Sequence, residues 1–113
     1  PIDAYGQGGF RFAGMSHRGA LLMVPSGIYA WPVADGAQID AASLARLFAE
    51  QDEIVRLMIG SGRDPAFLSP ALRLRLNEAK ISVDMQPTGG AASTYNFLLD
   101  EGRRVAAALI AAH

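Results

Sequence analysis

The sequence predicts an α/β fold with antiparallel strands at its N-terminus, a parallel strand-helix-strand unit in its middle and a long C-terminal helix. Short apolar runs separated by glycine-containing turns fill the first third of the chain, which is typical of antiparallel strands. Two later apolar runs flank a helix-start signal, and a unit of this length implies a right-handed crossover between parallel strands. From residue 88 onward the apolar residues recur with helical spacing.

The strands expected in the first third span residues 2–6, 9–13, 20–24 and 28–33. Turns are expected at residues 6–9, 16–19 and 25–27, because each contains a glycine that can adopt a positive φ.

In the middle of the chain, Asp40 is expected to cap a helix over residues 40–50, in which Leu44, Leu47 and Phe48 form an apolar stripe. The apolar run 54–59, ended by Gly60, is typical of a central strand buried on both faces.

The segment 72–76 alternates apolar and basic residues, which would suit a strand. Ser69-Pro70 is a strong helix start, however, so we predict a helix there, followed by a strand at 81–86. The long C-terminal helix is expected to contain one interior glycine, Gly102.

Length and composition indicate one folded domain over residues 1–113. Of the 113 residues, 50% are hydrophobic and 19% are charged, so the chain can bury one core and is not disordered. The formal charge of -1 supplies no general attraction to nucleic acid or anionic lipid, and we expect no nucleic-acid partner. The absence of cysteine excludes disulfides, thiolate catalysis and zinc sites built on sulfur.

No apolar run approaches the roughly 20 residues that a membrane-spanning helix needs, so we expect a soluble, cytoplasmic protein without membrane insertion. Because the chain starts with Pro1 and not Met, some N-terminal residues are expected to have been removed.

The best candidate for ligand binding is the loop Gly60, Ser61, Gly62 and Arg63, which leaves the expected central strand. Small residues would let backbone N–H groups approach an anion, and Arg63 would bind it with two hydrogen bonds. The spacing is not that of a phosphate loop. The alternative is a tight strand exit with a surface arginine.

A second junction leaves the next parallel strand and enters the last helix through Thr88 and Gly89, where free N–H groups and partial positive charge favour an anion. Adjacent parallel strands would bring both loops to one edge of the sheet, with Tyr95 and Asn96 lining the crevice. The alternative is that Thr88 is only a helix cap.

No catalytic residues can be assigned from the sequence. His17 lies in an expected turn, His113 is terminal, and Ser61 lacks both a nucleophile elbow and an indicated base. No ligand spacing suggests a metal, and no motif suggests a cofactor.

The aromatic residues of the first third suggest a surface. Phe10 and Phe12 share one strand face and Tyr29 and Trp31 another, and strands this short cannot bury both faces in a small domain. Tyr29 and Trp31 are therefore candidates for a partner surface. The alternative places them in the core of the sheet.

Nearly the whole chain resembles a family of largely uncharacterised bacterial and archaeal domains that includes mitochondrial complex I assembly factor 3 and adipogenesis-associated relatives. The resemblance rests on residues 2–6, 9–10, 21–27, 30–31, 59–63, 68, 70–72, 88–89, 94–96, 99 and 101–109.

The resemblance implies a three-layer α/β/α fold around a mixed sheet. It also implies a role in assembly through protein partners, as for the mitochondrial member, without catalytic residues to carry over. We therefore expect a non-catalytic interaction or assembly domain. The alternative is a domain, or an enzyme, that binds a small anion at the Gly60 to Arg63 loop and the Thr88 helix terminus.

Overall fold

The computed structural model describes residues 1–112, so the terminal His113 lies outside it. Five strands form the main sheet in the order β5-β4-β8-β6-β7. Strand β4 is antiparallel to both β5 and β8, whereas β6 is parallel to β8 and to β7. The sheet is therefore mixed, and the predicted parallel pair is confirmed. The strands are β4 (Ala20–Val24), β5 (Gly27–Trp31), β6 (Arg56–Gly60), β7 (Ser82–Gln86) and β8 (Val105–Leu109).

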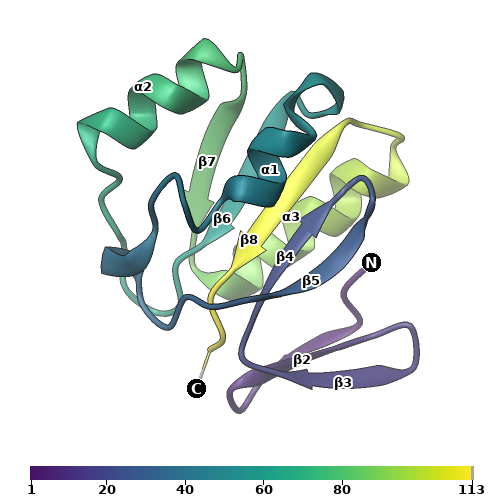
Figure 1. Ribbon diagram of the computed structural model, residues 1–113. Helices are drawn as coiled ribbons and strands as arrows, with labels where there is room; N and C mark the ends of the chain where they lie inside the picture. The colour runs from purple at the N-terminus through teal and green to yellow at the C-terminus, as the bar shows by residue number, and fades with distance from the viewer. Residues whose placement is uncertain (113) are drawn as a thin grey trace.

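Helices cover both faces of this sheet. Helix α1 (Ala45–Ala49) and helix α2 (Pro70–Glu78) lie on one face, and helix α3 (Thr88–Asp100) lies on the other, which gives the three expected layers (Figure 1). Two short 3-10 helices, η1 (Gly36–Gln38) and η2 (Gln51–Glu53), flank α1 in the sequence.

The chain begins with a separate three-stranded antiparallel sheet, made of β1 (Ala4–Gly6), β2 (Gly9–Phe12) and β3 (Met15–Arg18). The turn expected at residues 16–19 is wrong, because most of that segment is β3. The hairpin turn lies instead at Ala13 and Gly14, which both have positive φ (49° and 74°), as a two-residue turn between twisted strands requires.

The last element also differs from the prediction. Helix α3 ends at Asp100, a turn follows with Gly102 at φ 75°, and residues 105–109 form the central strand β8. All five residues of β8 are buried, with strands on both sides. An alanine-rich run offers no polar face in either conformation, so its helical spacing carried no information about where it packs.

The helix expected at residues 40–50 begins later than predicted. The Asp40 carboxylate accepts a hydrogen bond from the Ser43 N–H (2.7 Å), and the Ser43 hydroxyl accepts one from the Asp40 N–H (3.0 Å). This closed turn precedes α1. The helix start at Ser69 is confirmed, since its hydroxyl accepts a hydrogen bond from the Leu72 N–H (3.1 Å).

The core has two parts, one on each face of the main sheet, because alternate residues of a strand point to opposite faces. Leu57 and Ile59 of β6 pack with the α1 and α2 side, while Met58 packs with α3 and the three-stranded sheet. Phe10 of β2 is buried in the second part, which joins the small sheet to α3.

Candidate functional site

The two glycine-containing loops meet at the carboxyl edge of the parallel strands, as the sequence predicts. Gly60 pairs in register with Gln86, and the Ser61 N–H donates to the Gln86 carbonyl (3.0 Å). The Thr88 N–H donates to the Gly62 carbonyl (3.1 Å). The loops are therefore tied directly to one another.

Thr88 holds this junction together. Its side chain is fully buried; the hydroxyl donates to the Ile110 carbonyl (2.6 Å) and accepts from the Gly62 N–H (2.9 Å). The backbone donors of Ser61, Gly62 and Thr88 are thus used within the protein. The sequence suggested that these N–H groups would be free to bind an anion, but they already form hydrogen bonds within the protein. In this loop, the Arg63 guanidinium remains as the group that could bind an anion.

Two glycines allow the close approach of α3 to its neighbours. A Cβ on Gly60 would lie 2.9 Å from Leu109 Cδ2 and 3.0 Å from Thr88 Cα, and the second of these contacts, to backbone, is tighter than nine in ten real Cβ contacts. Gly89 lies against the side chain of Tyr5, which a Cβ there would overlap. Both positions are explained by packing.

Tyr95 and Asn96 do not line a crevice between the loops. Tyr95 is buried in the core beneath α3, and this burial raises the pKa of its hydroxyl above the usual value. The Asn96 amide group accepts from the Ile2 N–H and donates to the Ile2 carbonyl, both at 2.7 Å. Asn96 therefore fastens the N-terminal segment to α3.

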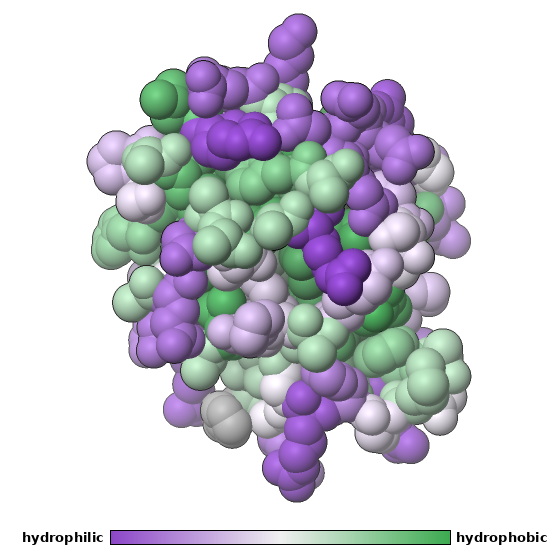
Figure 2. All heavy atoms as spheres, in the orientation of Figure 1, coloured by the Kyte–Doolittle hydropathy of each residue, from purple (hydrophilic) through white to green (hydrophobic). Residues whose placement is uncertain are grey.

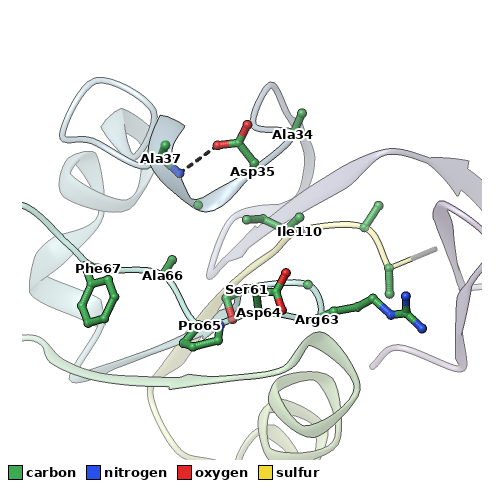
Figure 3. Close-up of a pocket in the computed structure, with 14 residues that line it drawn as sticks. Ala34, Asp35, Ala37, Ser61, Arg63, Asp64, Pro65, Ala66, Phe67 and Ile110 are labelled. Carbon is green, nitrogen blue, oxygen red and sulfur yellow. Dashed lines mark hydrogen bonds between the residues drawn. The ribbon is translucent and has the colours of Figure 1, made fainter.

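A cavity of about 500 Å³ opens beside the Gly60 to Arg63 loop. Its charged lining residues are Asp35, Arg63 and Asp64, and Asp35 accepts a hydrogen bond from the Ala37 N–H (2.9 Å). Figure 3 shows the Arg63 guanidinium pointing away from Asp35 and Phe67. Thr88 and Gly89 do not belong to the lining, which consists of residues 34–37, 61–67 and 110–112.

A second cavity, of about 430 Å³, lies between α2 and β7; we call it the β7 groove. It was not predicted, because the sequence does not say which strand ends the sheet. The alternation of Val83 and Met85 in β7 is the one signal that points to an apolar strand face there. The groove is lined by Ala66, Phe67, Leu68, Arg73, Leu76, Asn77, Ile81, Val83 and Met85.

Trp31 forms no partner surface, because its side chain is buried and its indole N–H donates to the Ser43 carbonyl (2.7 Å). Tyr29 is half-buried, with the Arg46 guanidinium 3.8 Å from its ring centroid and its hydroxyl 2.7 Å from the Ser26 hydroxyl. Strand β5, which contains both residues, packs against α1 and the turn before it. These elements cover the strand face that the sequence suggested would be exposed to a partner. Large apolar side chains are exposed elsewhere, at Tyr5, Met15, Phe67, Leu74 and Phe97.

His17 lies in β3 opposite Phe10 and is half-buried. Among residues 1–112, no three His, Cys, Asp or Glu side chains gather closely enough to hold a metal ion. None of the helices in that range is both long and apolar enough to cross a bilayer.

The model of a family described as "Protein of unknown function (DUF498/DUF598)" matches residues 2–110, so the chain belongs to that family. An uncharacterised protein of Rhodobacter capsulatus is 41% identical over 97% of this chain and 83% of its own length. The mouse protein named NADH dehydrogenase [ubiquinone] 1 alpha subcomplex assembly factor 3 is 30% identical over 96% of this chain. The chain spans 59% of that mouse relative's length. The family resemblance is confirmed.

Solved structures share the fold. A Bartonella henselae protein described as an outer membrane protein aligns with a TM-score of 0.95 and 46% identity, covering 100% of this chain and 95% of that one. The Rpa2829 protein of Rhodopseudomonas palustris aligns with a TM-score of 0.87 and 46% identity, covering 100% of this chain and 83% of that one.

Proposed function

We propose that this family member is a non-catalytic protein-interaction domain that serves in the assembly of a larger complex. The observation that carries the proposal is its similarity, along 96% of the chain, to animal proteins named as assembly factors of NADH dehydrogenase. The chain spans only about three fifths of the length of those relatives. Their names describe the whole proteins, so an assembly role for this chain is a proposal.

The exposed apolar side chains support a partner-binding role. Phe67 is 87% exposed and Phe97 63% exposed, although burying such a ring would stabilise the protein by about 1.5–3 kcal/mol. Figure 2 shows that on one face apolar surface is broken up by polar residues instead of forming one continuous patch. Such a surface suits a partner that binds through a few apolar anchors within a polar rim.

Cross-linking followed by affinity capture from the host cell tests this function. We expect the tagged chain to capture subunits or assembly intermediates of one membrane complex. Phe67→Ser should reduce that capture, and Tyr29→Phe, which keeps the ring under Arg46, is the matched control. Recovery of no common complex under conditions that preserve weak contacts would contradict the proposal.

A second candidate is a small-anion site at the 500 Å³ cavity, since the Gly60 to Arg63 loop borders it. Arg63 would hold the anion, because neighbouring backbone donors are already bonded within the protein. Asp35 and Asp64 in the same lining oppose a multiply charged anion, so a carboxylate is favoured over a phosphate.

Thermal-shift measurements with carboxylates, phosphates and nucleotides test that candidate. We expect one carboxylate to raise the melting temperature and Arg63→Ala to abolish the shift, while Arg103→Ala, an exposed arginine elsewhere, preserves it. A shift that survives Arg63→Ala would remove the loop from consideration.

A further inference from the structure

We propose that the β7 groove binds an extended segment of a protein partner, which adds to β7 as a sixth strand and carries apolar residues at alternate positions with acidic residues beside them. The inference rests on the proposed function, since it names the surface and the kind of segment through which a partner would be held.

Strand β7 presents an open edge. Within residues 1–112 its one strand neighbour is β6, with which it is parallel. The Ser82 N–H donates to the Val55 carbonyl, and the Gln86 carbonyl accepts from the Ser61 N–H, both at 3.0 Å. Because backbone groups alternate in direction along a strand, those of Val83 and Met85 point to the outer edge. Two N–H and two C=O groups are therefore arranged to pair with another strand.

The groove beside this edge is apolar. Val83 and Met85 share the strand face that looks toward α2, and both line the groove together with Leu76 and Ile81. Val83 is 37% exposed and Phe67, which also lines the groove, is 87% exposed. In an added strand, every second side chain would enter this space of about 430 Å³. Backbone pairing and side-chain burial would thus occur together, as in known strand-addition complexes.

Charge selects the kind of segment. Of the described residues that line the groove, Arg73 is the one that carries a charge. Its Nε–H donates to the Leu68 carbonyl (3.3 Å), which holds the guanidinium at the wall of the groove. An acidic side chain next to the apolar positions would form a charge-assisted hydrogen bond with the guanidinium.

A second copy of this chain fits the groove less well. Asp84 is the acidic residue of β7, and it points to the α3 face because it alternates with Val83 and Met85. Antiparallel pairing of two β7 strands keeps each side chain on its own face of the sheet. Self-pairing would therefore bring no β7 carboxylate to Arg73.

Fluorescence anisotropy with a labelled synthetic peptide tests the proposal. The probe has about ten residues, with valine and threonine in alternation and aspartates at both ends. We expect Val83→Glu to weaken binding by at least about tenfold and Ile28→Glu to change it by less than about twofold. Ile28 is the matched control, because it is 36% exposed against 37% for Val83 and lies on the opposite edge of the sheet.

Two altered peptides test the chemistry. A peptide with lysine in place of aspartate, and one N-methylated at consecutive central backbone nitrogens so that those facing β7 are blocked, should each bind at least about tenfold more weakly. Amide hydrogen exchange at Val83 and Met85 should slow when the unmodified peptide is bound. Equal binding of the N-methylated peptide, or unchanged exchange at these two amides, overturns strand addition.

The remaining outcomes separate this inference from the proposed function. Partners captured equally well by the wild type and by Val83→Glu would overturn the groove and leave the assembly role standing. Peptide binding with the expected dependence, but no captured complex, would support the groove and contradict the assembly role. A dimer in solution that Val83→Glu dissociates would identify a second copy as the occupant and overturn the partner proposed here.

Discussion

The two edges of the main sheet are built differently. At the β5 edge, side chains fasten the strand to the neighbouring helical segment: Ser26 donates two hydrogen bonds to Glu50, at 2.8 and 2.7 Å, and Trp31 donates one to Ser43. At the β7 edge, an apolar groove runs between the strand and α2. Contacts between a strand face and its own chain serve stability, whereas an apolar groove beside an edge strand is available to another polypeptide.

The largest expected effect is at the β5 edge. Trp31→Ala should lower the free energy of unfolding by about 3–5 kcal/mol, because it leaves a cavity between β5 and α1 and removes the partner of the Ser43 carbonyl. Chemical denaturation measures the loss. Trp31→Phe keeps most of the ring volume and should cost clearly less. A loss below about 1 kcal/mol for the alanine variant would mean that this edge is not held by its side chains.

The next effect tests how the carboxyl end of β7 is anchored. Thr88→Val keeps the shape of the side chain but leaves the partly buried Gly62 N–H and the buried Ile110 C=O without their partner, which should cost about 2–4 kcal/mol. Thr88→Ser keeps the hydroxyl and should retain most of that stability. Equal denaturation midpoints for the two variants would contradict the role assigned to the hydroxyl.

A smaller effect is expected at the exposed hydrogen bonds of the β5 hairpin. Glu50→Ala should cost about 0.5–1.5 kcal/mol, because two donors of Ser26 lose an acceptor but can bind water instead. Thermal unfolding measures this loss of stability. Glu50→Gln retains one acceptor oxygen, so its melting temperature should lie between those of the wild type and Glu50→Ala. A wild-type melting temperature in Glu50→Ala would show that the hairpin needs no such support.

The smallest effect on stability is expected at the open edge. Val83→Thr, which keeps a β-branched side chain on a partly exposed position, should change the free energy of unfolding by no more than about 0.5 kcal/mol. Ile28→Thr at the other edge is the comparison. A loss above about 1.5 kcal/mol for Val83→Thr would mean that the groove is part of the core, and the contrast between the edges would fail.

Much of the fold could be predicted where the signal is local. The cap at Ser69, the buried run ending at Gly60 and the strand after it led to the parallel pair and to the meeting of its two exit loops. Strand β3 was missed because its turn, Ala13-Gly14, is not among the common hairpin dipeptides. Strand β8 was missed because residues 105–109 are apolar throughout, and helix and strand bury such a run equally well.

The candidate site was predicted only in part. The closeness of the Gly60 and Thr88 loops follows from strand direction, but the use of their N–H groups depends on Thr88 also reaching Ile110. Residue 110 follows a strand that the sequence did not indicate. Tyr95 and Asn96 were assigned to a crevice because the packing of the N-terminal segment on α3 has no sequence signature.

By itself the sequence determined the elements that rest on short-range chemistry: helix caps, glycine turns and apolar runs long enough to require burial. The family also followed from it, because the matching residues extend along nearly the whole chain. Only the tertiary structure decided that β8 lies at the centre of the sheet and β7 at its edge. Strand order depends on contacts between residues far apart in the chain, and these determine which backbone groups are satisfied and which remain open to a partner.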